Sequence, residues 1–477
     1  MQQSVYNPGH TAFGGGASGS LLHPVVLTAL VAVAVLTFLL PRRYVIVPLL
    51  SLILLTPYGQ NLYVGGAHLY IPRLLVLLGL ARVLSMQRLD KRLPGGFKPL
   101  DKLFIAWALY RAGATLLQFV AVGAVVNQAA FLLDSLGAYF LFRRLIRDDA
   151  DILTVVKVFA GAAAIMAVVM IREQMTGQNM FGLLGGINLI SDLRNGRIRA
   201  QGPFQISIIA GSFGATIFPL CLWLWKKGSA RTLAIIGAAS AVVMTLMSAS
   251  STPLSALLAC FVALCLWPLR EQMRLIRWGI VAGLVGLQLV MKAPIWFVLS
   301  RIDFVGGSTG WDRAELIDMF VRHAGDWWLI GTHDNANWGW DMWDQCNQFV
   351  AEGESGGLVV LVCFVAMIVL CFKSIGGARR AIRGDLKKEW LFWLLGTTLF
   401  TQTMAYFGID YFDQSKYFWY ALLAMFSVTT RSAQSTFPDD SRKPMVPDSF
   451  WSISIPEGAS TQIGDPQGVQ RLCSYPS

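Results

Sequence analysis

Long apolar runs recur along almost the whole chain, from Leu21 to Ser427, and they limit the possible folds more than any other feature. A helix needs about 20 apolar residues to cross the hydrocarbon core of a bilayer, which is about 30 Å thick. Charged residues make up 14% of the 477 residues, whereas a soluble domain carries about 25%. The sequence therefore predicts a polytopic membrane protein and excludes a soluble enzyme or a secreted disulfide scaffold.

Apolar segments of suitable length are candidates for membrane-spanning helices. We predict an all-α fold, a polytopic transmembrane helical bundle of about 13 spans, within a range of about 12–14. The segment near residue 50 is the weakest candidate, because it is short and begins directly after Arg43. The predicted centres lie near residues 32, 50, 77, 111, 135, 161, 214, 240, 260, 287, 365, 398 and 423.

The distribution of Lys and Arg predicts the orientation of these spans. Of the 39 basic residues, 27 fall in one alternating set of loops, nine in the other set, and three within spans. Because cytoplasmic loops carry the excess of basic residues, the C-terminus is predicted to be cytoplasmic and the N-terminus external. The N-terminus changes side if the first or second span is misassigned. The net charge of +11 thus reports orientation in a cytoplasmic (inner) membrane, and we expect no nucleic-acid partner.

Two long external segments and two polar ends define the predicted domain organisation. The long segments run from about residue 172 to 203 and from about 294 to 355, the second one before the last three spans. The second contains seven tryptophans, which favours a folded cap at the membrane surface, and Leu316, Met319 and Phe320 can lie on one side of an amphipathic helix. We predict disordered ends at 1–20 and 433–477 and one transmembrane domain over 21–432.

Cysteine spacing and known motifs give no support for a cofactor or a metal site. Five of the seven cysteines lie in apolar runs, where cysteine acts as a small hydrophobic residue. The other two, Cys346 and Cys473, fall on opposite sides of the predicted membrane. The sequence contains no GxxxxGK[ST] phosphate-binding loop and no HExxH zinc motif. We therefore expect chemistry without a cofactor or metal ion.

Arginines on the predicted external side are candidates for binding a lipid diphosphate. The planar, permanently charged guanidinium suits phosphate oxygens. Arg197 and Arg199 come just before a span, Arg313 and Arg322 lie in the second long segment, and Arg73 lies near the outer end of its span. The alternative is a solvated loop, or pairing with the nearby acids Asp303, Asp312, Glu315 and Asp318.

His333 and Glu354 are the candidates for a general base. Histidine titrates near neutral pH without special tuning, and a carboxylate partly withdrawn from water can also exchange protons. The alternatives are a packed or surface histidine and a charge at the membrane interface. Within spans, Arg111 and Asp134 need charged partners or a water-filled cavity. Asp410, in the last external loop, is interpreted as structural.

Three parts of the chain resemble the O-antigen ligase and polymerase-like family of bacterial membrane glycosyltransferases. The early spans are similar at residues 41–44 and 70–75, and residues 199–204 resemble the family's entry into a central span. The most informative likeness is in the second long segment, where Arg313 precedes the amphipathic helix. It continues through residues 326–331, which resemble a Pro-Leu-x-Gly passage, and 354–358, which resemble a Glu-x-Gly-x-x-Gly-Leu re-entry.

The resemblance implies a fold of the GT-C type and an undecaprenyl-diphosphate glycan as donor. It implies that the external arginines hold the diphosphate, with membrane lipids and other polysaccharide-assembly proteins as further partners. It also implies that the cap contacts sugar rings, and we assign these contacts to Trp327, Trp338, Trp340, Asn347 and Gln348. Many family members carry His-Asn before the re-entry, but residues 343–348 of this chain contain no histidine. This departure favours a polysaccharide polymerase over a ligase.

Three other interpretations remain open. A ligase that transfers finished glycan to another acceptor would share the donor site and differ in the acceptor. A flippase for lipid-linked glycans belongs to another functional class, and it usually needs a polar path that this chain's few intramembrane charges do not obviously supply. A scaffold protein would leave the external arginines unexplained.

Overall fold

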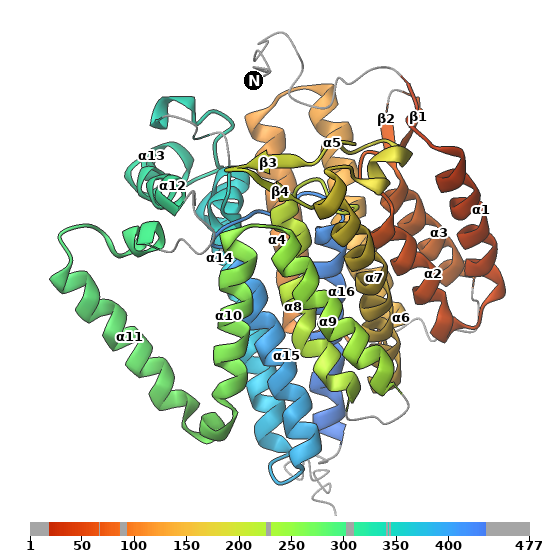
Figure 1. The fold of residues 1–477 in the computed structure, drawn as a ribbon. Helices are drawn as coiled ribbons and strands as arrows, with labels where there is room; N and C mark the ends of the chain where they lie inside the picture. Colours follow the sequence, from red (N-terminus) through yellow and green to blue (C-terminus); the bar gives the residue numbers. More distant parts are fainter. Residues whose placement is uncertain are drawn as a thin grey trace, which may run out of the picture. The chain divides into compact units, whose positions relative to one another are not determined.

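Helices account for nearly all the regular structure in the computed structural model, and two short hairpins supply the strands (Figure 1). The structure describes residues 19–65, 67–85, 93–225, 230–301, 310–339, 342 and 345–435. The α-helices are α1 (Pro24–Leu39), α2 (Arg42–Leu55), α3 (Ile71–Ser85), α4 (Pro99–Gln118), α5 (Val122–Leu132), α6 (Ala138–Leu145), α7 (Asp149–Thr176), α8 (Ser207–Trp225), α9 (Arg231–Met247), α10 (Ser251–Cys265), α11 (Met273–Val290), α12 (Gly310–Arg322), α13 (Ala324–Trp327), α14 (Gln348–Ala381), α15 (Leu386–Ala405) and α16 (Ser415–Ser435). A π-helical turn, η1 (Leu133–Gly137), joins α5 to α6, and the 3-10 helices are η2 (Met180–Leu184), η3 (Trp267–Gln272), η4 (Ile295–Arg301) and η5 (Ala336–Trp338).

Each predicted span centre lies within a helical segment of the structure. Five segments of the described chain are long and apolar enough to cross a membrane by length and composition, whereas α1, α9 and α10 are shorter apolar helices. The five are Val122–Leu145, Asp149–Thr176, Ser207–Trp225, Trp267–Val290 and Gln348–Ala381. The prediction of a helical membrane protein is confirmed at this level. The predicted disordered ends lie almost entirely outside the described residues.

Two antiparallel hairpins correct the expectation of purely helical structure. Strands β1 (Asn61–Val64) and β2 (Ala67–Tyr70) pair just before α3, and β3 (Asp192–Arg194) and β4 (Arg197–Arg199) pair before α8. In the second hairpin, Asn195 and Gly196 both have positive φ, at 49° and 73°. Asn-Gly favours this two-residue turn because both residues tolerate left-handed backbone angles.

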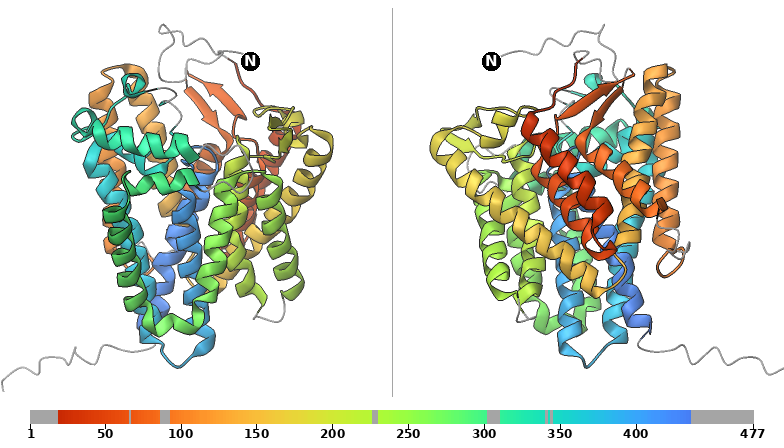
Figure 2. Two further views of the ribbon diagram at one scale, coloured as in Figure 1. Left: turned by 60° about the vertical axis from the view of Figure 1, so that its left-hand side comes forward. Right: turned by 90° about the vertical axis from the view of Figure 1, so that its right-hand side faces the viewer.

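Both hairpins and the helices α12 and α13 lie at one end of the bundle, which we call the cap end (Figures 1 and 2). The two segments predicted to be long and external therefore meet at the same end, as an alternating topology requires. The opposite end, here the tail end, is held by buried ion pairs. Arg143 donates through Nε and Nη2 to Asp101 at 3.0 and 3.1 Å, and Arg42 donates to Asp151 at 3.0 Å. Several basic residues of the basic-rich loops thus have structural partners.

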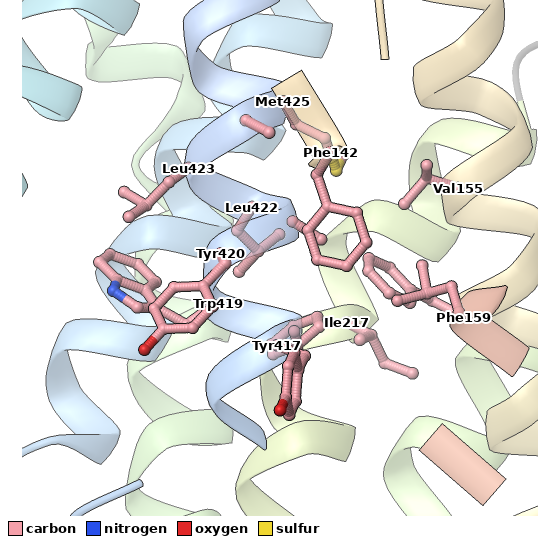
Figure 3. Close-up of a cluster of buried hydrophobic side chains, with 14 of the residues drawn as sticks. Phe142, Val155, Phe159, Ile217, Tyr417, Trp419, Tyr420, Leu422, Leu423 and Met425 are labelled. Carbon is pink, nitrogen blue, oxygen red and sulfur yellow. The ribbon is translucent and has the colours of Figure 1, made fainter. Parts of the chain in front are cut away.

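The last helix, α16, forms the centre of the core. Figure 3 shows Tyr417, Leu422 and Met425 of α16 on the side of Phe142 of α6, Phe159 of α7 and Ile217 of α8, and Trp419 and Leu423 on the other side of the helix. The rings of Phe159 and Phe213 each meet that of Phe418 edge to face, with centroids 5.0 and 4.9 Å apart. Elements from both halves of the sequence are therefore fixed around one helix.

Helix α11 differs from the other long helices because it lies apart from the bundle (Figure 1). None of its residues is buried, and large apolar side chains such as Trp278, Val285 and Leu289 are exposed. From Trp278 to Val290 the helix carries one polar side chain, Gln288, and such an exposed, largely apolar segment suits surrounding lipid. α11 leads from η3 at the tail end to η4 beneath α12.

Helix α14 is interrupted near the cap end, where Gly356 and Gly357 leave the helical conformation. Gly357 has φ +73°, a region that favours glycine. The chain between α13 and η5 lies across the break and supplies its hydrogen bonds. Thr332 N–H donates to the Glu354 carbonyl at 2.8 Å, and Leu358 N–H donates to the Trp328 carbonyl at 2.8 Å. Residues 326–331 and 354–358, separate in sequence, therefore form one structural unit.

We predict that Gly357→Ala destabilises the protein by about 1–3 kcal/mol, because a side chain there is strained at positive φ. Its Cβ would also collide with the Leu329 carbonyl. Gly376→Ala is the matched control, since this glycine lies in the same helix with open space around it. The measurement is the thermal unfolding temperature of the full chain in detergent. Equal unfolding temperatures for the two variants would contradict the account of the break.

Candidate functional site

The cap, defined here as the described residues from 310 to 347, has a small aromatic core of its own. Trp327 stacks on Phe320 with ring centroids 3.9 Å apart and donates through Nε1 to the Phe320 carbonyl at 2.7 Å. Trp338 stacks on His323 at 5.4 Å and donates to Asp326 Oδ2 at 3.1 Å. The predicted amphipathic helix is confirmed as α12, and its inward side carries Leu316 and Phe320.

This packing bears on the tryptophans assigned to sugar contacts. Trp327 and Trp338 are each 5% exposed, and each has a ring face occupied by a neighbouring ring. Their observed role is to hold the cap together. Trp311 and Trp328 are the exposed tryptophans of the described cap, at 58% and 54%. Trp340 lies outside the described residues.

Glu354 occupies the centre of the region where α14, the cap and the α15–α16 loop meet. Its side chain is nearly inaccessible to water, with 2% of the residue exposed. Asn335 donates through Nδ2 to Oε1 at 3.2 Å, and Gln345 donates through Nε2 to Oε2. The Asp410 carboxylate is near enough to interact electrostatically with Glu354. Glu354 is thus a buried acid held in one orientation by two cap amides, with a second acid beside it.

Asn347 and Gln348 begin α14 and have structural partners. The Asn347 side chain caps the helix by accepting N–H bonds from Phe349 and Val350 at 2.9 and 3.3 Å. Gln348 donates to Glu352 Oε1 at 2.8 Å and accepts from the Tyr411 backbone N–H at 2.8 Å. Both side chains are buried, so they position the re-entry of α14. None of these contacts identifies a sugar-binding site.

His333, the other candidate base, lies at the outer edge of the cap. Its side chain is exposed, and its ring lies 4.8 Å from that of Phe119, in the turn that follows α4. No described contact joins it to Glu354. The two candidate bases therefore occupy different surroundings, one exposed and one buried.

Arg199, one of the predicted diphosphate ligands, lies on β4. It donates through Nη2 to Ser250 Oγ at 2.7 Å and through Nη1 to Asp192 Oδ2 at 3.1 Å. Cys346, next to the Gln345 that holds Glu354, lies near Arg199. Burial lowers the pKa of Arg199 from its usual value, while Asp192 opposes that shift. The guanidinium is thus partly desolvated and paired with an exposed acid.

The N-terminus of α10 adds to the positive field at Arg199. Ser250 is the N-cap residue, and its hydroxyl binds Arg199 without capping the helix. The first N–H groups of a helix and its dipole favour an anion at that end. The α15–α16 loop approaches the same helix end, where Thr252 Oγ1 donates to the Gly408 carbonyl at 3.5 Å. Arg199, the start of α10 and the α15–α16 loop beside Glu354 therefore converge.

The other predicted arginines occupy different positions. Arg197 is exposed on the β3–β4 hairpin, and Arg313 is buried on the cap helix α12. Arg322 is 66% exposed and pairs with Asp318 at 2.7 Å, which matches the alternative of pairing with a local acid. Arg73 lies on α3 and pairs with Asp134 of η1. Arg313 lies on the helix that packs against α14 beside Glu354, where Phe320 of α12 touches Gly353.

Several residues of this region are not among the functional candidates predicted from the sequence. Ser250 was identifiable from Ser-Ser-Thr-Pro, a signal for the start of a helix. Arg111 was recognised as costly, and its partner is Glu352, at 3.4 Å, which also accepts from Trp107 Nε1 at 2.8 Å. Residues 353–357 also match the GxSxG nucleophile pattern, which requires a strand-to-helix elbow. Ser355 lies instead in α14 and donates to the Glu352 carbonyl at 3.1 Å, so that context is missing.

Two of the stretches quoted for the family resemblance, residues 326–331 and 354–358, lie together in the folded chain, whereas residues 41–44 lie at the tail end. Residues 199–204 supply Arg199, residues 326–331 cover the break in α14, and residues 354–358 form it. Their meeting depends on the fold and could not be read from their order alone. Neither a scan of the chain against protein-family models nor a search of curated proteins finds a match.

Proposed function

We propose that this protein is a membrane glycosyltransferase that polymerises lipid-linked oligosaccharide units into a surface or exopolysaccharide. The donor is an undecaprenyl-diphosphate glycan, and the reaction takes place at the outer face of the cytoplasmic membrane. In this proposal the fold is of the GT-C type with about 13 spans, and the cap end is external. The cap is then the part of the enzyme that meets the glycan.

One observation carries the proposal: a partly desolvated arginine and a helix N-terminus converge with a buried, hydrogen-bonded acid at the cap end. Arg199 and α10 form an electropositive surface that suits a diphosphate. Glu354 lies across the adjacent loop, held by Asn335 and Gln345. Such an arrangement suits a reaction in which a diphosphate leaves and an acceptor hydroxyl loses a proton.

The proposed step is a displacement at the anomeric carbon of the donor. The bond from that carbon to the diphosphate oxygen breaks, and a bond to the acceptor hydroxyl oxygen forms. Glu354 accepts the hydroxyl proton, and the diphosphate leaves on its lipid. Arg199 stabilises the charge that develops on the departing diphosphate, an effect that acts in the transition state. The exposed Trp311 and Trp328 are the cap side chains available for sugar contacts.

We predict that Arg199→Ala lowers polymer synthesis about 10²–10³-fold, because one donor to the departing diphosphate is removed. Arg194→Ala is the matched control, since Arg194 is exposed on the same hairpin. We expect its activity to stay within about twofold, as for an exposed charge. Polymer yield is measured with purified full-length protein and a lipid-linked repeat unit. Full yield from the Arg199 variant at normal protein abundance would exclude it from the donor site.

We predict that Glu354→Gln lowers kcat about 10²–10⁴-fold while binding of the lipid-linked donor persists. The exposed His333 serves as the comparison, and His333→Gln is expected to keep most of the activity. Single-turnover kinetics on both variants, with donor binding measured separately, check this pair. An inactive His333 variant beside an active Glu354 variant would reverse the assignment of the base.

Deletion of the gene in its own host tests the reaction class. We expect single lipid-linked repeat units to accumulate on the outer face of the membrane, measured by the size and side of the trapped glycan. Full-length polymer retained on undecaprenyl diphosphate would instead identify a ligase. Units confined to the cytoplasmic face would identify a transporter and refute glycosyl transfer.

A further inference from the structure

An apolar groove lies between α8 and α9, in the part of the bundle near the tail end. It has a volume of about 330 Å³, and its nine lining residues are all apolar. They include Trp225 and Ile235, which are 50% and 52% exposed, and Cys221, which is fully buried. The groove therefore opens toward the surroundings of the bundle.

The length of the groove matches part of one lipid leaflet. Its lining residues extend from Phe218 to Trp225 on α8 and from Ala234 to Val242 on α9. At about 1.5 Å per residue, each stretch is about 10–12 Å long. One leaflet contributes about half of the 30 Å hydrocarbon core, or about 15 Å. Because the groove starts at the last residue of α8, it lies within the leaflet at the tail end.

A positive charge lies where the groove meets the tail end. Arg231 is the first residue of α9, three and four residues before the lining residues Ala234 and Ile235, so all three lie on one side of the helix. Arg231 is exposed and forms no ion pair with any residue that the structure describes. The first turn of α9 contains no acid. Since the helix dipole also places positive charge at this end, an anion there is favoured by both.

The surroundings of the groove at this end match the headgroup level of the leaflet. Trp225 is the last residue of α8 and is half exposed, as tryptophans at a membrane–water interface are. The tail end carries the basic-rich loops and is therefore predicted to be cytoplasmic. Anionic phospholipids give the cytoplasmic leaflet its negative surface potential. An apolar groove, an interfacial tryptophan and an unpaired guanidinium thus lie together where such lipids are found.

We propose that the groove binds one anionic phospholipid of the leaflet at the tail end. One acyl chain lies between α8 and α9, and the phosphate oxygens accept hydrogen bonds from the Arg231 guanidinium. A second copy of the chain is a less favourable occupant, because a protein surface over the groove would withdraw the Arg231 charge from water. The site is built from other residues than the Arg199 and Glu354 region, and it does not depend on the proposed glycosyl transfer.

The lipid would hold a helix that also supports the cap end. α9 begins at Arg231 and ends at Met247, whose carbonyl accepts the Ala200 N–H bond at 3.1 Å. Ala200 directly follows Arg199 at the end of the β3–β4 hairpin. A ligand that binds the folded chain and not the unfolded chain raises its stability. We therefore expect the phospholipid to raise the unfolding temperature of the protein.

Lipid titration of the full-length protein in detergent tests the inference. The probe is dioleoylphosphatidylglycerol, and native mass spectrometry counts the bound molecules. Dioleoylphosphatidylcholine is the comparison, because its choline cation offsets the phosphate charge. We expect one phosphatidylglycerol to bind about tenfold or more tightly than phosphatidylcholine. Arg231→Gln should raise the Kd for phosphatidylglycerol about tenfold, whereas the matched control Arg274→Gln should change it less than about twofold. Arg274 is also exposed in the first turn of a tail-end helix, α11, but it does not line the groove.

Filling the groove is the second test. Ala239 is an exposed lining residue, so Ala239→Leu places a larger apolar side chain in the path of the acyl chain. We expect it to weaken the binding of both phospholipids and to remove the rise in unfolding temperature. Ala282→Leu, at an exposed position of α11, is expected to leave both unchanged.

Three results would overturn the proposal. The first is an equal affinity of the wild-type protein for the two phospholipids. The second is unchanged phosphatidylglycerol binding in both the Arg231→Gln and the Ala239→Leu variants. The third is a dimer in the same mass spectra that binds no phospholipid until it dissociates, which would assign the groove to a second copy. If one variant does not fold, the other variant and the wild-type headgroup preference decide.

Discussion

A backbone polar group in apolar surroundings must find a hydrogen-bond partner, and this constraint shapes the cap end of the chain. Gly356 and Gly357 interrupt α14, which frees a carbonyl and an N–H group. The Thr332 N–H group donates to the freed Glu354 carbonyl, and the Trp328 carbonyl accepts from the freed Leu358 N–H group. Since these two bonds hold the cap chain against α14, they help to place the side chains of Asn335 and Gln345 beside Glu354. The orientation of Glu354 thus depends on the break that Gly356 and Gly357 make in α14.

The distribution of charge separates the two ends of the bundle. At the tail end, buried acids are paired with arginines, as in Asp101 with Arg143 and Asp151 with Arg42. At the cap end, Arg199 is partly desolvated and its partner Asp192 is 64% exposed. An arginine whose acid partner remains in water can exchange that partner for another anion, which suits the proposed diphosphate.

The sequence predicted what depends on local pattern, and it failed where long-range contacts decide. Long apolar runs located the spans, and the amphipathic pattern predicted α12. The Asn195–Gly196 hairpin was missed despite a local signal, because residues 172–203 were predicted only as a long external segment with no local structure assigned. Trp327 and Trp338 were assigned to sugars because nothing in a sequence shows that Phe320 and His323 cover their rings. The partners of Arg73 and Arg111 lie 61 and 241 residues away in the sequence, and only the fold brings such distant residues together. The partners of Glu354 lie 19 and 9 residues away, in a segment without regular spacing.

The separation of α11 from the bundle has a consequence for how this chain tolerates change. Since no α11 residue is buried, exchanging one apolar side chain for another there replaces one lipid contact with another. Its sequence is therefore free to drift within the limits of hydrophobicity and length, whereas α16, buried from Tyr417 to Val428, is not. The two helices thus carry very different amounts of information about the fold.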